Sequence, residues 1–206
     1  IADAGVLHVI YGSSAGLAAP GGDQLWHQNV TGVDDAAEAG DHYGWTLAVG
    51  DFDGDGRADL AVGVPFEDVG DVIDAGAAHV LYGSASGLVV ARDQFWNQDS
   101  MGISDMAEAD DHFGVALTSG DFDGDGNADL VVGVPDEDIG SLIDAGAAHV
   151  IYGSTAGLAA PGGDQQWHQN AMGIAHTAEA NDQFGYALAA LPRTTHRAYL
   201  PLMLRR

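Results

Sequence analysis

The stretch that decides the fold occurs twice, as DFDGDGRADL at residues 51–60 and as DFDGDGNADL at residues 121–130. In both copies aspartates occupy positions 1, 3, 5 and 9, and glycines occupy positions 4 and 6. Carboxylates crowded in this way repel one another unless a cation lies between them, and calcium suits a flexible cage of oxygen ligands. The glycines allow the tight curl that brings alternate side chains together. The sequence therefore predicts two calcium loops.

The position of each residue in the loop predicts its role. We expect the carboxylates at positions 1, 3, 5 and 9 and the backbone carbonyl at position 7 to bind the ion, which then fixes the turn between two strands. The predicted ligands are Asp51, Asp53, Asp55, Arg57 and Asp59 in the first loop, and Asp121, Asp123, Asp125, Asn127 and Asp129 in the second.

The residues that follow these loops distinguish calcium loops from two alternatives. An EF-hand would have a bidentate glutamate at position 12 and a helix on each side. Position 12 is Val62 or Val132, inside short β-branched runs that end at Pro65 and Pro135, and such runs predict strands. The other alternative is an acidic turn without metal. The repetition of every ligand position favours calcium.

Composition limits the class of function. The chain has 206 residues, no cysteine and a formal charge of −25, which excludes a disulfide scaffold and thiol chemistry. An acidic body repels phosphate backbones, so we expect no nucleic-acid partner. No stretch approaches the roughly 20 apolar residues that span a bilayer, so we expect no membrane span. The chain starts at Ile1, as a processed or truncated product would. Open calcium loops fill most readily at extracellular calcium concentrations, which favours a secreted or surface location.

Internal repeats define the architecture. The run DAGVLHVIYG at residue 3 returns as DAGAAHVLYG at residue 74 and as DAGAAHVIYG at residue 144, about 70 residues apart each time. One period of the repeat predicts four strands. The first runs from the aromatic-glycine pair through TLAVG or ALTSG, and the second is DLAVGVP or DLVVGVP. The third is AAHVLYGS, and the fourth is the DQxW segment. Four-stranded sheets in tandem predict an all-β fold of the β-propeller type.

The order of an aromatic-glycine pair, GDFDGDG and DLxVGVP resembles the FG-GAP repeat of the integrin α-subunit propeller and its bacterial relatives. The resemblance covers residues 1 to about 191. It implies calcium in the loop between the first two strands of a blade, with these loops on one face of the propeller. It also implies an extracellular role in adhesion or in binding a protein or glycan, without enzyme activity.

Unit boundaries follow from the repeat. Residues 1–42 predict a partial blade with third and fourth strands, residues 43–112 and 113–183 predict complete calcium-binding blades, and residues 184–206 predict a partial blade with a basic, apolar tail. The tail run YLPLML could serve as a second strand. The half-blades could meet within one chain, or between chains in a ring or filament. The alternatives are a fragment of a larger propeller and an anchoring or sorting tail.

Other candidate residues have structural explanations. Residues that recur with the repeat are interpreted as structural, including the histidines His8, His79 and His149 and the tryptophans Trp26, Trp96 and Trp167. Trp45 does not recur, and its alternatives are packing, which we favour, and sugar stacking. Secondary ligation of the metal, loop rigidity or solubility explains Glu67, Asp68, Glu137 and Asp138 better than a glycosidase pair does. Weak signals for attached glycans occur at Asn29, Thr194 and Thr195.

Three classes of function remain, in order of support. The first is a binding or adhesion module, since no catalytic constellation is found in the sequence. The second is a self-assembling surface or filament protein, supported by the partial terminal units. The third is an accessory domain of a secreted hydrolase.

Overall fold

The computed structural model describes residues 1–17, 23–191 and 202–204. These ranges contain fourteen β-strands and no helix, so the all-β prediction is confirmed. They accordingly hold no helix long and apolar enough to cross a membrane. The strands are β1 (Leu7–Ile10), β2 (Gly12–Ser13), β3 (Gly16–Leu17), β4 (Asp23–Trp26), β5 (Thr46–Gly50), β6 (Asp59–Val64), β7 (Ala77–Ser84), β8 (Gly87–Trp96), β9 (Ala116–Gly120), β10 (Asp129–Val134), β11 (Ala147–Ile151), β12 (Gln165–Trp167), β13 (Ala187–Ala189) and β14 (Leu202–Leu204).

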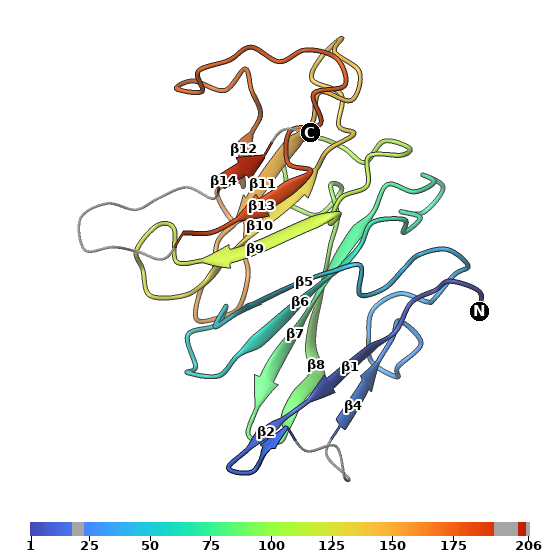
Figure 1. Cartoon of the computed structure of the whole chain (residues 1–206), viewed down its shortest axis with the longest axis vertical. Helices are drawn as coiled ribbons and strands as arrows, with labels where there is room; N and C mark the ends of the chain where they lie inside the picture. The colour runs from blue at the N-terminus through green and yellow to red at the C-terminus, as the bar shows by residue number, and fades with distance from the viewer. Residues whose placement is uncertain (18–22, 192–201, 205–206) are drawn as a thin grey trace.

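Two four-stranded antiparallel sheets form the centre of the molecule (Figure 1). Their strand orders are β5-β6-β7-β8 and β9-β10-β11-β12, so each sheet uses four consecutive strands. The two-stranded sheets β1-β4 and β13-β14 lie on either side of this pair, and β2-β3 is a small hairpin. The predicted β-propeller-type arrangement of tandem blades, with incomplete blades at both ends, is confirmed.

The second strand of each complete sheet forms the core. Every residue of β6 and β10 is buried, because a neighbouring sheet covers each of the two faces. Val62 of β6 packs in one cluster with Trp26, while Ala61 packs in another with Val80 and Val132. Alternate residues of a strand point to opposite faces, so β6 joins the sheet before it to the sheet after it.

Each Asp-Ala-Gly turn binds the residue that begins the next unit. The backbone amide of Phe113 donates to the carbonyl of Ala75 at 2.9 Å. Gly76 lies in this turn with φ of +84°, and a Cβ there would lie 2.4 Å from the carbonyl oxygen of Phe113, so only glycine fits. The same bond joins Tyr43 to Ala4 and Phe184 to Ala145.

The aromatic-glycine pairs belong to these junctions and precede the first strands. The sequence predicts first strands that start at Tyr43 and Phe113, but β5 begins at Thr46 and β9 at Ala116. The reason is that the backbone of the aromatic residue bonds to the preceding unit before the chain turns into its own sheet. The remainder of each predicted first strand is observed.

The two outer sheets are complementary halves. Strand β13 pairs with β14 in the register Ala187 to Leu204, so the LML part of the tail run forms a strand beside β13. Strand β1 pairs with β4 in the register Leu7 to Trp26. The first pair corresponds to strands one and two of a complete sheet, and the second pair to strands three and four. The rest of the tail, with Thr194 and Thr195, lies outside the described residues.

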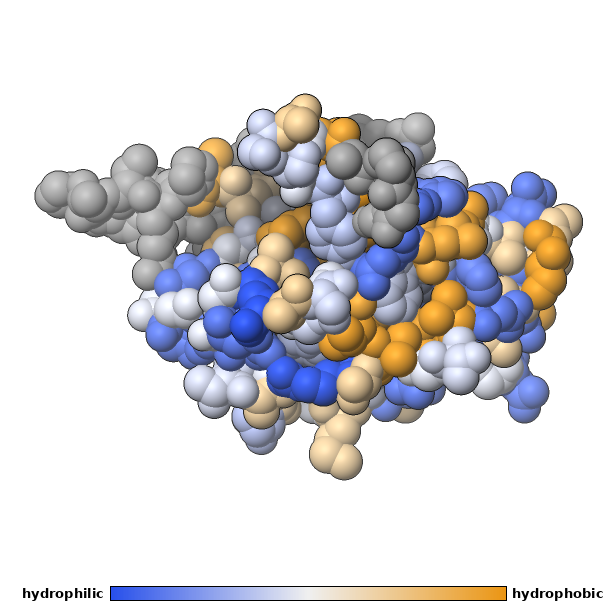
Figure 2. Space-filling model, turned by 90° about the horizontal axis from the view of Figure 1, so that it is seen from below, coloured by the Kyte–Doolittle hydropathy of each residue, from blue (hydrophilic) through white to orange (hydrophobic). Residues whose placement is uncertain are grey.

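One face of the β1-β4 sheet is exposed. Val6 and Ile10, with Leu25 opposite on β4, are exposed although they are large and apolar. The space-filling view from this end has apolar side chains among hydrophilic ones (Figure 2). The residues at the same repeat positions in the next unit, Ala77 and Leu81, are fully buried. The first unit therefore packs against its neighbour on one side only.

Candidate metal centres

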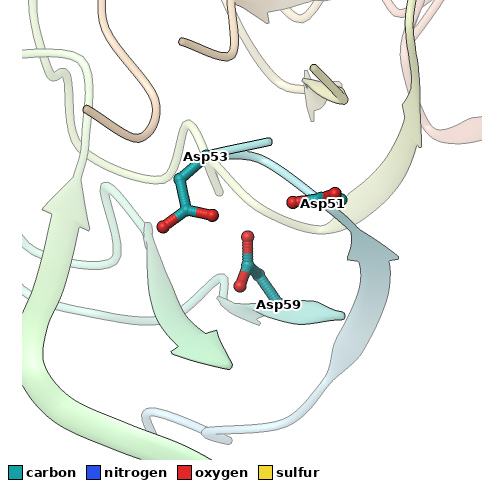
Figure 3. Close-up of side chains that lie close together, drawn as sticks. All are labelled: Asp51, Asp53 and Asp59. Atoms are coloured by element: carbon teal, nitrogen blue, oxygen red, sulfur yellow. The ribbon is translucent and has the colours of Figure 1, made fainter. Parts of the chain in front are cut away.

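The first aspartate loop joins β5 to β6 and brings three carboxylates together. Asp51, Asp53 and Asp59 each offer an oxygen, and these atoms lie within 4.8 Å of one another. Their side chains point toward a common centre (Figure 3). Asp53 and Asp59 are buried, and Asp51 is half-buried. Positions 1, 3 and 9 of the predicted ligand set thus converge.

Backbone amides hold these carboxylates in place. Asp59 accepts hydrogen bonds from the amide of Phe52 at 2.7 Å and from the amide of Gly83 at 2.8 Å. Asp51 accepts one from the amide of Gly56 at 3.0 Å. The curl that permits this bond depends on Gly56, whose φ is +84°. The loop is therefore shaped around its carboxylates.

The electrostatics of the first loop are those of a site that attracts a cation. Burial, together with the charges of Asp53 and Asp51, raises the pKa of Asp59 above its ordinary value, although the two backbone amides lower it. The Oδ1 atom of Asp51 is buried and has no hydrogen-bond partner among the described residues. A buried carboxylate oxygen without a donor, beside two further carboxylates, fits a hard divalent cation.

The second loop repeats this arrangement between β9 and β10. Asp121, Asp123 and Asp129 also bring oxygens within 4.8 Å of one another. Asp129 accepts hydrogen bonds from the amides of Phe122 at 2.6 Å and Gly153 at 2.9 Å. Burial raises the pKa of Asp129, as it does for Asp59. Asp123 is exposed, whereas Asp53 in the first loop is buried, so the second triad is more open to solvent.

Position 5 lies outside both triads. Asp55 is exposed and accepts a bond from the Arg57 guanidinium at 2.6 Å, and Asp125 accepts one from the Asn127 side-chain amide at 2.7 Å. Both aspartates also accept the backbone amide of the position-7 residue, at 2.9 Å for Arg57 and 2.8 Å for Asn127. The ligand roles of positions 5 and 7 stay predictions.

Arg92 is a site residue that the sequence patterns missed. It lies on β8, and its Nη1 atom donates to Oδ2 of Asp53. Its guanidinium carbon lies 4.5 Å from the ring centroid of Tyr82. The DQxW segment aligns Arg92 with Gly163 in the next unit. The arginine that replaces a glycine in the repeat was the sequence signal that could have identified this residue. Nothing in the sequence, however, linked Arg92 to Asp53, which lies 39 residues earlier.

The two loops touch each other through their backbones. The amide of Ala128 in the second loop donates to the carbonyl of Asp51 at 2.8 Å. A Cβ added at Gly54 would lie 2.3 Å from Oδ1 of Asn127. The two candidate metal centres are thus adjacent on the molecule.

The carboxylates considered for glycoside hydrolysis are instead part of unit junctions. Glu67 and Glu137 are buried, and they accept hydrogen bonds from the side chains of Gln28 and Gln98 in the preceding units. Burial, with Asp35 nearby, raises the pKa of Glu67 to about 10. These contacts support the structural interpretation.

The recurring histidines and tryptophans pack as expected, with one exception among the histidines. His79 and His149 are buried, and Trp26 and Trp96 lie in core clusters. His8, however, is exposed. Trp45 is also half-exposed, and its ring makes edge contacts with His42 and Phe66 at 5.6 Å each. Trp45 thus packs against these two rings while half of its side chain stays exposed, and both alternatives for it, packing and sugar stacking, stay predictions. Asn29 is exposed.

Comparisons with known proteins agree with the fold and the loops. The family description FG-GAP repeat matches residues 43–81 and 113–151, the two spans that contain the aspartate loops. The chain is 34% identical over 114 residues to phosphatidylinositol-glycan-specific phospholipase D of Rattus norvegicus. It is 32% identical over 139 residues to integrin alpha-PS2 of Drosophila melanogaster, and 28% identical over 190 residues to integrin alpha-3 of Mus musculus.

These matches cover a large share of this chain but only a small share of each relative. They cover 55%, 65% and 89% of this chain, in the same order. They cover only 13%, 9% and 15% of the relatives. The predicted resemblance to FG-GAP repeats of the integrin type is confirmed, and the chain is similar both to integrin alpha subunits and to a protein named as a phospholipase.

Proposed function

We propose that this chain, which carries two FG-GAP repeats, is a calcium-binding module that recognises a protein or glycan ligand outside the cell or at its surface. The observation that carries the proposal is the repeated aspartate triad. Each triad gathers three oxygens, and in the first one the Oδ1 atom of Asp51 is buried without a donor from the residues that the structure describes. The relatives named integrins support the binding role and the location.

Calcium has a structural role in this proposal. The ion offsets the repulsion between the carboxylates, and Asp51, Asp53 and Asp59 would hold it in the first loop. Asp121, Asp123 and Asp129 would do so in the second. Since the triads form only when the strands are paired, binding stabilises the folded state.

The test is calcium-dependent unfolding of the wild-type chain and the D53N/D123N variant. We expect calcium at 100 times its Kd to stabilise the wild type by about 2.7 kcal/mol per site. The variant should lose most of this gain. The exposed loop residue Asp71 provides the control D71N, which should behave as the wild type. An equal gain in D53N/D123N and wild type would exclude these triads as calcium sites.

The role in recognition is non-enzymatic in this proposal. The phospholipase D relative is matched over 13% of its length, so its activity does not transfer with the repeats. A screen of immobilised extracellular matrix proteins and glycans, with calcium and with chelator, tests ligand binding. Hydrolysis of a glycan in that screen, abolished by substitution of Glu67 or Glu137, would instead support the hydrolase alternative.

Self-association is a second candidate function, supported by the two half-sheets. Placed side by side, β13-β14 of one copy and β1-β4 of another have the order of a complete sheet. Charge complementarity also supports this pairing, since the body is acidic and four of the six basic residues follow Leu191. Electron microscopy and light scattering test it: rings or filaments that vanish with chelator are expected, and monomers at high concentration in calcium would refute it.

A further inference from the structure

We propose that Arg92 sets the calcium affinity of the first loop, acting as a tethered cation that weakens binding there. The inference rests on the proposed calcium site at Asp51, Asp53 and Asp59. Arg92 lies outside the loop, on β8, and the repeat pattern alone does not predict that this strand contacts the metal site.

The geometry ties Arg92 to one ligand of the triad. Its guanidinium donates to Oδ2 of Asp53, whose side chain is only 4% exposed, while the Arg92 side chain is 45% exposed. The ring of Tyr82 lies 4.5 Å beneath the guanidinium, and a cation–π contact of this kind holds the group over the loop. The other carboxylate oxygen of Asp53 accepts the amide of Asp55 at 3.2 Å.

The sign of the effect does not depend on whether the arginine moves. If Arg92 stays on Asp53, its charge repels the incoming cation. If calcium displaces it, binding must first break the ion pair. In both cases Arg92 also relieves the repulsion among the carboxylates of the calcium-free loop. The free energy released when calcium binds is therefore smaller. All three effects lower the affinity.

Arg57 offers a comparison in the same loop, because Arg57→Gln removes the side-chain charge but keeps the backbone carbonyl that is the predicted ligand. Arg57 carries the same charge, but its Nη1 atom contacts Asp55 at 2.6 Å, outside the triad. Both side chains of that pair are substantially exposed to solvent, at 47% and 33%. Exposed pairs are strongly screened and contribute little. Removal of Arg57 should therefore change calcium binding much less than removal of Arg92.

The experiment measures calcium binding by calorimetry in the full chain with D123N, which leaves the first loop as the site observed. We expect R92Q/D123N to bind calcium at least roughly five-fold more tightly than D123N. That is the factor for two unit charges about 4 Å apart under bulk-water screening, and it is a lower limit for a doubly charged ion. R57Q/D123N should change by less than about two-fold. R92K/D123N keeps the charge and should stay close to D123N.

The outcomes separate this inference from the calcium proposal. Unchanged or weaker binding in R92Q/D123N, in a chain whose circular dichroism is that of the parent, would overturn the inference and assign Arg92 a role in holding Asp53 in place. Equal tightening in R92Q and R57Q would also overturn it, since net charge alone would then be responsible. A folded D123N chain that binds no calcium would overturn the calcium proposal for the first loop itself.

Discussion

The same sequence motif has two environments in the first and the third repeat units. In the first unit, His8 and Asp23 are 57% and 44% exposed, with 3.4 Å between Nδ1 and Oδ2. In the third unit the corresponding pair, His149 and Asp164, is fully buried, and Asp164 also accepts the amide of Ser104 from the preceding unit at 2.7 Å. Burial is thus a property of the neighbouring unit, and identical residues should differ in energetic importance.

The largest expected difference is between Asp164→Ala and Asp23→Ala. Removal of Asp164 leaves His149 without its acceptor in a buried site, and we expect a loss of roughly 3–5 kcal/mol in the free energy of unfolding. Asp23→Ala should cost at most about 1 kcal/mol, because its pair is exposed. Urea unfolding in saturating calcium measures both. Equal losses would mean that the buried pair gains nothing from its covering unit.

The junctions that create this difference should also respond to pH. Burial, with Asp111 and Asp105 nearby, raises the pKa of Glu137 to about 9, so the folded chain keeps a proton that the unfolded chain releases above about pH 4.5. The free energy of unfolding is therefore highest at low pH and falls as the pH rises from about 4.5 toward 9. For this carboxyl the fall is at most about 1.4 kcal/mol per pH unit.

Unfolding of wild type and E137Q between pH 6 and 8.5, in saturating calcium, measures this slope. We expect E137Q to flatten the decline, because the amide has no proton to lose. Glu38→Gln is the control, since the Glu38 side chain is exposed and lies in another unit. A slope that E137Q leaves as steep as in the wild type would contradict the prediction.

The smallest expected effect concerns one methylene group. Ile151 is fully buried and Ile10 is 45% exposed at the same repeat position. Ile151→Val should cost roughly 0.5–1.5 kcal/mol, and Ile10→Val should cost a few tenths at most. Thermal unfolding of the two variants side by side suffices. A loss at Ile10 that matches the loss at Ile151 would show that another copy of the chain covers the exposed face in solution.

Local features of the fold could be predicted from the sequence because they depend on short stretches. The runs DLAVGV and DLVVGV predicted strands that are buried throughout, and the spacing of the aspartates predicted their convergence, which holds at Asp51, Asp53 and Asp59. The β-branched residues and the glycines specify these features within about ten residues.

What the sequence could not predict depends on contacts between units. The partial exposure of Trp45 and its ring contacts with His42 and Phe66 depend on how the surrounding segments fold. The contact of Arg92 with Asp53 joins β8 to the loop after β5, and the bond from Ala128 to Asp51 joins successive units. Such pairs join residues that are far apart in the sequence. A repeat pattern indicates them only where one residue, such as Arg92, departs from the repeat.

The Asp-Ala-Gly turn has a consequence for how such a chain lengthens. The bond that joins one unit to the next runs between backbone atoms, and the side-chain requirement is the missing Cβ of a glycine such as Gly76. A duplicated segment that ends in this turn already contains the carbonyl that binds the next unit. The neighbouring unit therefore needs no matching change in sequence. Arrays of this kind can therefore gain a whole unit by one duplication of the gene segment, and the new unit is held from the start.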